Sequence, residues 1–299
     1  MNLTALRTRS PGAVTGSALY DDVAMETSAR VIARYSTSFG MASRLLTPDV
    51  RTHVRNIYAL VRVADEIVDG VAREAGLSNS DIVRRLAAFE AETDLACATG
   101  YSTNLVIHAF ALTARQVGIP QELTRPFFAS MRADCTETTH TPESFSAYVY
   151  GSAEVIGLMC LRAFLDGHSV TADQEARLVS GARHLGAAFQ KVNFLRDLSA
   201  DFDGLGRNYF PGVELDSFSE DDKARLLADI DADLAASSAA LPGLPASSRR
   251  AVALAQLLFG ELTERIRSTP ASALIRTRVR VPASVKLRLA AAAAAGKLP

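Results

Sequence analysis

The sequence lacks an unbroken apolar run of the roughly 18 residues that crossing a bilayer requires. It has only three cysteines, and Cys97, Cys135 and Cys160 show no metal-binding spacing such as C-x-x-C. Such a scattered, odd set indicates reduced, buried thiols, so we expect a cytoplasmic protein. Residues 1–19 have no continuous apolar region and predict a flexible tail, not a secretory signal.

Strand signals and a charge imbalance are missing too. No Asn-Gly or Asp-Gly pair lies between alternating apolar runs, so strands are not indicated. The 33 acidic and 32 basic side chains give no reason to expect a nucleic-acid partner. No glycine-rich dinucleotide fingerprint is present, and NADPH is therefore not expected. The sequence does not define an oligomeric state.

Helix signals dominate what remains, and a hydrophobic fraction of 48% suffices for a core. Thr47 with Pro48 and Thr141 with Pro142 both resemble an N-cap followed by proline in the first turn. Helices are predicted over residues 21–35, 48–68, 81–99, 104–117, 124–134, 142–164, 172–203, 220–240 and 247–267, and after Pro282. We predict one all-α domain, residues 20–299, with a central cavity.

A polar stripe runs along the predicted helix that includes residues 190–201. Asn193, Asp197 and Asp201 stand at i, i+4 and i+8, and therefore share one face. Gln190 and Arg196 flank them. The stripe is either a solvated face or a site for a hard cation, because burying it without a partner would be costly.

A second acidic pair favours the site. Asp65 and Asp69 stand at i, i+4, and Arg62 precedes them by one turn. Carboxylate oxygens suit Mg²⁺, or Mn²⁺ in its place, and guanidinium groups suit phosphate oxygens. The two stripes could therefore face each other across a cation–diphosphate cluster. The alternative for Arg62 and Asp65 is an ordinary i,i+3 ion pair on an exposed helix.

Four segments together resemble the squalene/phytoene synthase family of head-to-head prenyltransferases, most closely its bacterial phytoene synthases. Residues 65–69 match its D-x-x-x-D element, and residues 190–211 match Q-x-x-N-x-x-R-D-x-x-x-D followed by G-R-x-Y-x-P. Residues 35–39 resemble its S-x-S/T-F segment, and residues 148–157 its Y-x-Y-x-V-A-G-x-V-G helix. The likeness covers about residues 20 to 290.

The resemblance implies an all-α isoprenoid-synthase fold and Mg²⁺-dependent joining of two allylic diphosphates through a cyclopropyl diphosphate. It implies metal ligands at Asp65, Asp69, Asn193, Asp197 and Asp201, of which the four aspartates also count as catalytic, together with Tyr148. It implies substrate contacts at Ser36, Ser38, Tyr58, Arg62, Gln190, Arg196, Arg207 and Arg278.

Some positions depart from the family pattern. Ala200 replaces a frequent glutamate, and Tyr35 a histidine of some members. Ser152 and Glu154 replace a valine and a glycine, which would put a charge near the tunnel wall.

The choice of substrate rests on smaller signals. The D-E-I-V-D-G form of residues 65–70 favours phytoene synthases, and Ser43, four residues after Phe39, leaves room for a longer chain. We therefore expect two C20 geranylgeranyl diphosphates to give phytoene in carotenoid biosynthesis. The alternatives are a squalene or dehydrosqualene synthase that uses C15 farnesyl diphosphate, and a non-catalytic binding relative. The basic run 276–288 makes peripheral membrane contact a further expectation.

Overall fold

The computed structural model describes residues 16–205 and 208–299, without the side chains of residues 199–205 and 215. Within these ranges the chain forms helices and one isolated bridge between Thr139 and Asn208, and it forms no strand. The all-α prediction is therefore confirmed. The longer helices are α1 (Gly16–Tyr35), α3 (Pro48–Val68), α5 (Asn79–Thr99), α6 (Leu105–Val117), α7 (Gln121–Thr136), α8 (Pro142–Val149), α9 (Val155–Leu165), α10 (Ala172–Leu205), α11 (Glu220–Ala240), α12 (Ala246–Ser268) and α14 (Ala283–Ala294).

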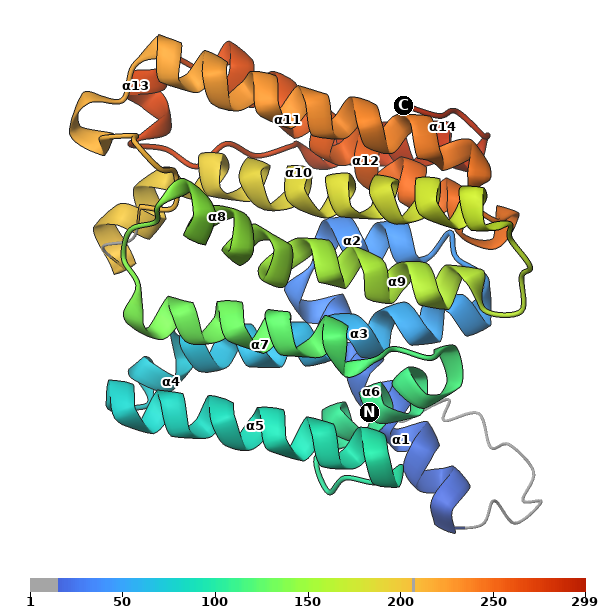
Figure 1. Ribbon diagram of the computed structural model, residues 1–299. Helices are drawn as coiled ribbons and strands as arrows, with labels where there is room; N and C mark the ends of the chain where they lie inside the picture. The colour runs from blue at the N-terminus through green and yellow to red at the C-terminus, as the bar shows by residue number, and fades with distance from the viewer. Residues whose placement is uncertain (1–15, 206–207) are drawn as a thin grey trace, which may run out of the picture.

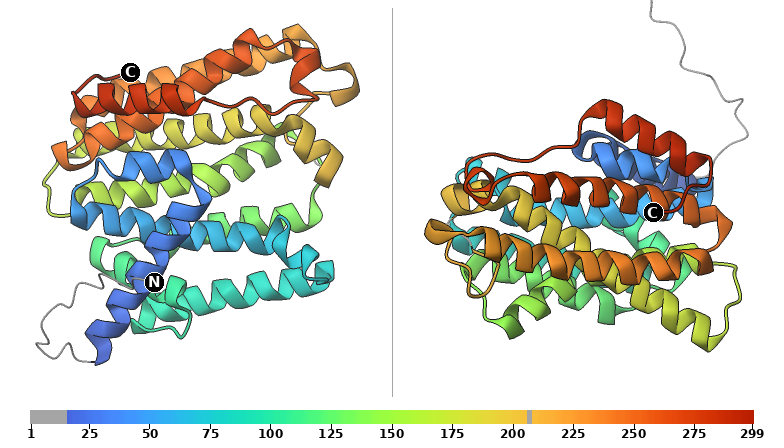
Figure 2. Two further views of the ribbon diagram at one scale, coloured as in Figure 1. Left: turned by 180° about the vertical axis from the view of Figure 1, so that it is seen from behind. Right: turned by 90° about the horizontal axis from the view of Figure 1, so that it is seen from above.

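The helices stack in successive layers with α10 near the centre. In Figure 1 the layers run upward from α5, through α7 with α3 and α8 with α9, to α10 and then α11 and α12. Helix α10 packs against α9, α11 and α12, and α1 crosses behind to pack on α3 and α6, as the rear view in Figure 2 shows. Two large apolar clusters result, one centred on α3, α6 and α7 and the other on α10, α11 and α12.

Local capping explains where the helices begin and end. Ser78, Thr141 and Ser219 each form a reciprocal capping box, which satisfies orphan N–H groups of the first turn. Gly100 and Gly118 end α5 and α6 with φ of 85° and 69°, a region that glycine enters at little cost. Because Ser78 is the N-cap, α5 starts at Asn79, two residues before the predicted start at residue 81.

Helix α7 begins earlier than predicted. The predicted start at residue 124 puts Pro126 in the first turn, but α7 starts at Gln121 and Pro126 lies in its interior. Proline there removes one backbone N–H donor from the helix. The carbonyl oxygen of Pro126 lies close to Gly151. A Cβ on Gly151 would lie 2.2 Å from that oxygen, so only glycine permits this approach.

The predicted helix 142–164 has a π-helical turn, η1 (Tyr150–Glu154), between α8 and α9. Residues Pro142–Leu165 form the one helical stretch, among those described, that is long and apolar enough to cross a membrane. Half of its most apolar 18-residue part is buried, and the stretch packs against α7 and α10, which is typical of a core helix. Three short helices were not predicted: α2 (Thr37–Ser43), α4 (Val71–Glu74) and α13 (Ala271–Leu274).

Candidate functional site

A cavity of about 530 Å³ lies between the two apolar clusters. Helices α2, α3, α9 and α10 supply most of its wall, with contributions from α7, α8, α11 and α12. Ten of the residues expected from the sequence line it: Tyr58, Arg62, Asp65, Asp69, Tyr148, Gln190, Asn193, Arg196, Asp197 and Arg278. Both acidic stripes therefore face one cavity.

One face of α10 runs the length of this cavity and changes character along it. Asp197, Asn193 and Gln190 stand at one end. The same face continues with aromatic, small and aliphatic side chains, namely Phe189, Gly186, Leu185, Ala182, Gly181 and Leu178. Asp197 and Leu178 are 19 positions apart, or about 28 Å at the rise of an α-helix. The cavity thus has a polar end and an apolar end.

The wall formed by α3 concentrates charge at the polar end. Arg62 Nη1 lies 2.6 Å from Asp65 Oδ2, and Arg62 also pairs with Glu66. Burial, and secondly the neighbouring Asp69 carboxylate, raise the pKa of Asp65 from 3.8 to about 7 against the opposing effect of Arg62. Asp69 caps the C-terminus of α3 through its backbone N–H. Negative charge on Asp65 is therefore unfavourable in this environment.

The facing wall holds Asp197 between two guanidinium groups. Arg196 Nε lies 3.0 Å from Asp197 Oδ1, and Arg278 Nε lies 2.7 Å from the same oxygen. Arg278 comes from the segment between α13 and α14, so the C-terminal part of the chain reaches the cavity. Among the three arginines of that segment, Arg278 is the one in the wall.

Two tyrosines of the wall are shielded from solvent, Tyr148 almost fully and Tyr58 in part. Burial is the main cause that raises the pKa of Tyr58 above 10.0, and the charge of Arg62, followed by a hydrogen bond with Ser36, opposes it. Burial also raises the pKa of Tyr148 well above its usual range, and Asp134 and then Tyr209 add to the effect. Both phenols are therefore neutral at physiological pH.

The remaining expected residues lie elsewhere. The Ser36 side chain accepts the Phe39 N–H as the N-cap of α2, and neither Ser36 nor Ser38 lines the cavity. Their phosphate role stays a prediction. Arg207 and the side chain of Asp201 lie outside the described residues.

The departures from the family pattern have local explanations. Glu154 does not line the cavity, so the expected charge at the tunnel wall is wrong: Glu154 pairs at 2.6 Å with the half-exposed Arg183. Ser152 does face the cavity, and its buried hydroxyl has no hydrogen-bond partner among the described atoms. Phe39 and Ser43 both line the cavity from α2, as their four-residue spacing predicted.

Sequence patterns did not assign a role to Tyr209 or to Asp134. Tyr209 lies in the wall and stacks on Phe194 with ring centroids 4.0 Å apart. It was within the matched G-R-x-Y-x-P segment, which was the available signal. Asp134 stands in no pattern, and its position follows only from the fold.

The profile of the squalene/phytoene synthase family matches residues 32–285. The phytoene synthase of Mycobacterium tuberculosis is 30% identical over 282 residues, which cover 87% of each chain. The 15-cis-phytoene synthase of Enterobacter agglomerans is 27% identical, over 77% of this chain and 82% of its own. The match to the 15-cis-phytoene synthase of a Paracoccus strain, at 29% identity, spans 64% of this chain and 60% of that relative.

Solved structures show the same architecture. A dehydrosqualene synthase in complex with ligand superposes with a TM-score of 0.77 at 20% identity, over 93% of this chain and 97% of its own. Squalene synthase HpnC from Alicyclobacillus acidocaldarius superposes with a TM-score of 0.70 at 20% identity, over 83% and 95%. These likenesses establish the fold, and the profile match together with the mycobacterial relative establishes the family. The chain belongs to the squalene/phytoene synthase family.

Proposed function

We propose that this protein joins two geranylgeranyl diphosphates head to head, in a Mg²⁺-dependent reaction, to give phytoene for carotenoid biosynthesis. The observation that carries the proposal is the face of α10 that leads from Asp197 and Asn193 to Leu178. An allylic isoprenyl diphosphate has the same division between an anionic head and a hydrocarbon tail. The phytoene synthases among the relatives support this substrate class.

The donor set fits a divalent cation. Negative charge on Asp65, beside the Asp69 carboxylate, is unfavourable, as the raised pKa of Asp65 indicates. Mg²⁺ prefers such oxygen ligands and is commonly shared with substrate phosphates. Asp65, Asp69, Asn193, Asp197 and Asp201 would hold it, and Mn²⁺ would suit the same oxygens. When bound, the metal supplies Lewis acidity that favours departure of the diphosphate.

Arginines at the polar end would meet the diphosphate. Arg62 Nε is buried and has no hydrogen-bond partner among the described atoms, so one donor is left for a substrate oxygen. Arg196 and Arg278 already lie beside Asp197 at the cavity wall. Guanidinium groups bind phosphate oxygens in pairs, which fixes the head group as well as neutralising it.

The apolar end would protect the reaction from water. One substrate loses its diphosphate to give an allylic cation, and the 2,3-double bond of the other attacks it. Proton loss then gives a cyclopropyl diphosphate. This intermediate loses its diphosphate and rearranges to a second cation, which loses a proton to give the hydrocarbon. The aliphatic and aromatic wall, including Phe39, Phe189 and Leu185, would exclude water that would otherwise trap the cation.

The depth of the cavity supports a C20 chain. Asn193 and Leu178 are 15 positions apart on α10, or about 22 Å. An extended isoprenoid, at about 1.2 Å per bond by analogy with backbone dimensions, spans about 14 Å for C15 and about 19 Å for C20. The longer chain uses most of the available length.

Product analysis tests the proposal directly. The purified protein is incubated with Mg²⁺ and either the C15 or the C20 diphosphate, with and without NADPH, and the hydrocarbon is identified by chromatography. Phytoene from the C20 substrate, without NADPH, is expected. Hydrocarbon from the C15 substrate alone would point to a squalene or dehydrosqualene synthase. No turnover of either would favour a non-catalytic binding protein.

A cytoplasmic protein with peripheral membrane contact completes the proposal. The basic residues Arg276, Arg280 and Arg288 are exposed, and the three cysteines are free thiols. Anionic headgroups attract such side chains, and the substrates partition into lipid.

A further inference from the structure

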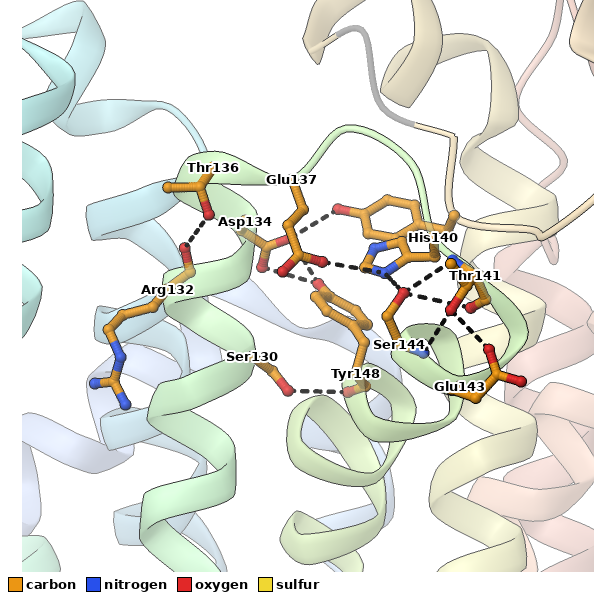
Figure 3. Close-up of polar contacts among 11 residues, drawn as sticks. Ser130, Arg132, Asp134, Thr136, Glu137, His140, Thr141, Glu143, Ser144 and Tyr148 are labelled. Atoms are coloured by element: carbon orange, nitrogen blue, oxygen red, sulfur yellow. Dashed lines mark hydrogen bonds and ion pairs between the residues drawn. The ribbon is translucent and has the colours of Figure 1, made fainter.

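A buried carboxylate lies behind the polar end of the cavity. Asp134, in the last turns of α7, is 5% exposed. The Tyr148 hydroxyl lies 2.8 Å from each of its carboxylate oxygens (Figure 3), and the Tyr209 hydroxyl donates to Oδ1 at 3.1 Å. Three segments distant in sequence therefore meet at one side chain.

Burial of this carboxylate carries a desolvation cost. Taking a charge out of water costs several kcal/mol, which hydrogen bonds and neighbouring charges have to offset. Asp134 also acts on the metal-binding wall: after burial and Asp69, it contributes to the raised pKa of Asp65. A third carboxylate near that pair increases the repulsion. Its presence there indicates a role beyond stability.

The two tyrosines connect Asp134 to the cavity. Tyr148 and Tyr209 both line the wall, and their ring centroids are 5.3 Å apart. Ser130 Oγ donates to the backbone carbonyl of Tyr148 at 3.0 Å, which anchors this part of α8 to α7 (Figure 3). Because each hydroxyl donates to a carboxylate, its oxygen becomes more electron-rich, and its ring is held in one orientation.

We propose that Asp134 is a positioning residue that fixes Tyr148 and Tyr209 and makes this part of the wall electronegative where the allylic cation forms. The inference rests on the proposed function. Preorganised dipoles aimed at developing charge favour the transition state over the neutral chain. The uncharged hydrocarbon gains little from the same groups. Asp134 therefore acts on the cation rather than on substrate binding.

Two unreactive C20 ligands separate these effects. One is a diphosphate in which an ammonium nitrogen replaces the carbon that becomes cationic in the reaction. The other is a thiolo-diphosphate, in which sulfur replaces the bridging oxygen and the chain carries no charge. In Asp134→Asn we expect affinity for the ammonium ligand to fall about tenfold or more, as for other preorganised groups. We expect affinity for the thiolo ligand to stay within about twofold. Equal changes for both ligands would overturn the proposal.

Asp233→Asn is the matched control. Asp233 is also a buried carboxylate, 7% exposed, but it pairs with His184 and Lys191 between α10 and α11 and does not line the cavity. This variant should lose thermal stability while the ratio of the two affinities stays unchanged. A changed ratio would mean that any buried negative charge has the effect, and would overturn the specific role of Asp134.

The double variant Tyr148→Phe with Tyr209→Phe tests the connection. On its own it should weaken the ammonium ligand selectively, which keeps the proposal testable if Asp134→Asn fails to fold. When Asp134→Asn is combined with the double variant, the ratio of the affinities for the ammonium and thiolo ligands should change by less than about twofold, because coupled groups are not additive. If Asp134→Asn weakened the ammonium ligand as strongly in the double variant as in the wild type, Asp134 would not act through the tyrosines and the proposal would be overturned. If the wild type binds neither ligand, the proposed function fails as well; if it binds both and no variant discriminates, only this role fails.

Discussion

Arg278 Nε lies 2.7 Å from Asp197 Oδ1, although the two residues are 81 positions apart in the sequence. The pair joins the segment after α13 to the polar stripe of α10. Asp197 also bonds Arg196, so the metal-free carboxylate is already neutralised. A cation that binds Asp197 must therefore displace or rearrange at least one guanidinium group.

Arg278→Gln should change metal and substrate binding in opposite directions. Mg²⁺ alone should bind about two- to fivefold more tightly, which is the scale of a half-exposed ion pair. The KM for the diphosphate substrate should rise, because one phosphate contact is lost. Titration calorimetry and steady-state kinetics measure the two effects. Arg276→Gln, at an exposed site outside the cavity, is the control, and equal behaviour of both variants would contradict the prediction.

Removal of a proposed metal ligand should abolish turnover. Asp69→Ala and Asp197→Ala should each lower kcat by about 100-fold or more, because they remove oxygen ligands from opposite walls. Glu66→Ala, next to Asp65 but outside the cavity wall, should retain turnover within about tenfold. Single-turnover assays at saturating Mg²⁺ measure the difference. Undiminished turnover in the two aspartate variants would reject the metal assignment.

The raised pKa of Asp65 predicts how stability depends on pH in the metal-free protein. The folded state binds a proton up to about pH 7, whereas the unfolded carboxyl loses it near 3.8. The protonated carboxyl therefore favours folding below 3.8, and this contribution is lost as the pH rises through 7.

Asp65→Asn should remove this dependence. Its melting temperature should exceed that of the wild type by about 2–4 °C at pH 8, after allowance for partial solvent screening, and the advantage should shrink toward pH 4. Calorimetry without divalent cations measures it. Asp221→Asn, on the exposed face of α11, controls for the loss of one negative charge. A pH-independent difference would show that Asp65 titrates normally.

Spacing on a single helix was sufficient to predict the polar stripe of α10. Asn193 and Asp197 share a face in any α-helix, and the cavity lies where the stripe indicated. The outward direction of Glu154 was beyond such reasoning, because the π-helical turn at Tyr150–Glu154 adds a residue and rotates the following side chains. Asp134 could not be predicted either, since its tyrosine donors come from 14 and 75 positions away. Tertiary packing alone brings such groups together.

Glycines at the crossing of α10 with η1 and α9 should resist substitution. A Cβ on Gly186 would lie 2.6 Å from the carbonyl oxygen of Ala153, and its three nearest neighbours are all backbone atoms, which cannot yield easily. Gly186→Ala should lower the free energy of unfolding by about 1–3 kcal/mol. Gly260→Ala in α12 is the control, because its Cβ meets nothing within 4 Å, and it should stabilise the protein by about 0.4–1 kcal/mol. Urea unfolding compares the two, and the same sign for both would contradict the packing argument.

Ser43 should limit chain length from the apolar end. The Arg51 side chain donates to the Ser43 carbonyl at 3.2 Å, which places Ser43 beside the first turn of α3. Along α3, Asp65 lies 14 positions after Arg51, which corresponds to about 21 Å. A C20 chain reaches about 19 Å from the diphosphate end and a C15 chain only about 14 Å. The Ser43 side chain is 3% exposed and part of the cavity wall, so under the proposed function it would lie next to the last isoprene unit of the longer substrate.

Ser43→Phe should accordingly penalise the C20 substrate. We expect kcat/KM for the C20 diphosphate to fall roughly tenfold more than for the C15 diphosphate, a ratio typical of steric discrimination in an apolar pocket. Ser284→Phe, at an exposed position of α14, adds the same ring outside the cavity and should leave the ratio unchanged. Competition between the two substrates, read from the products, gives the ratio directly. An equal loss for both would mean that Ser43 does not lie near the end of the chain, and that another part of the wall sets its length.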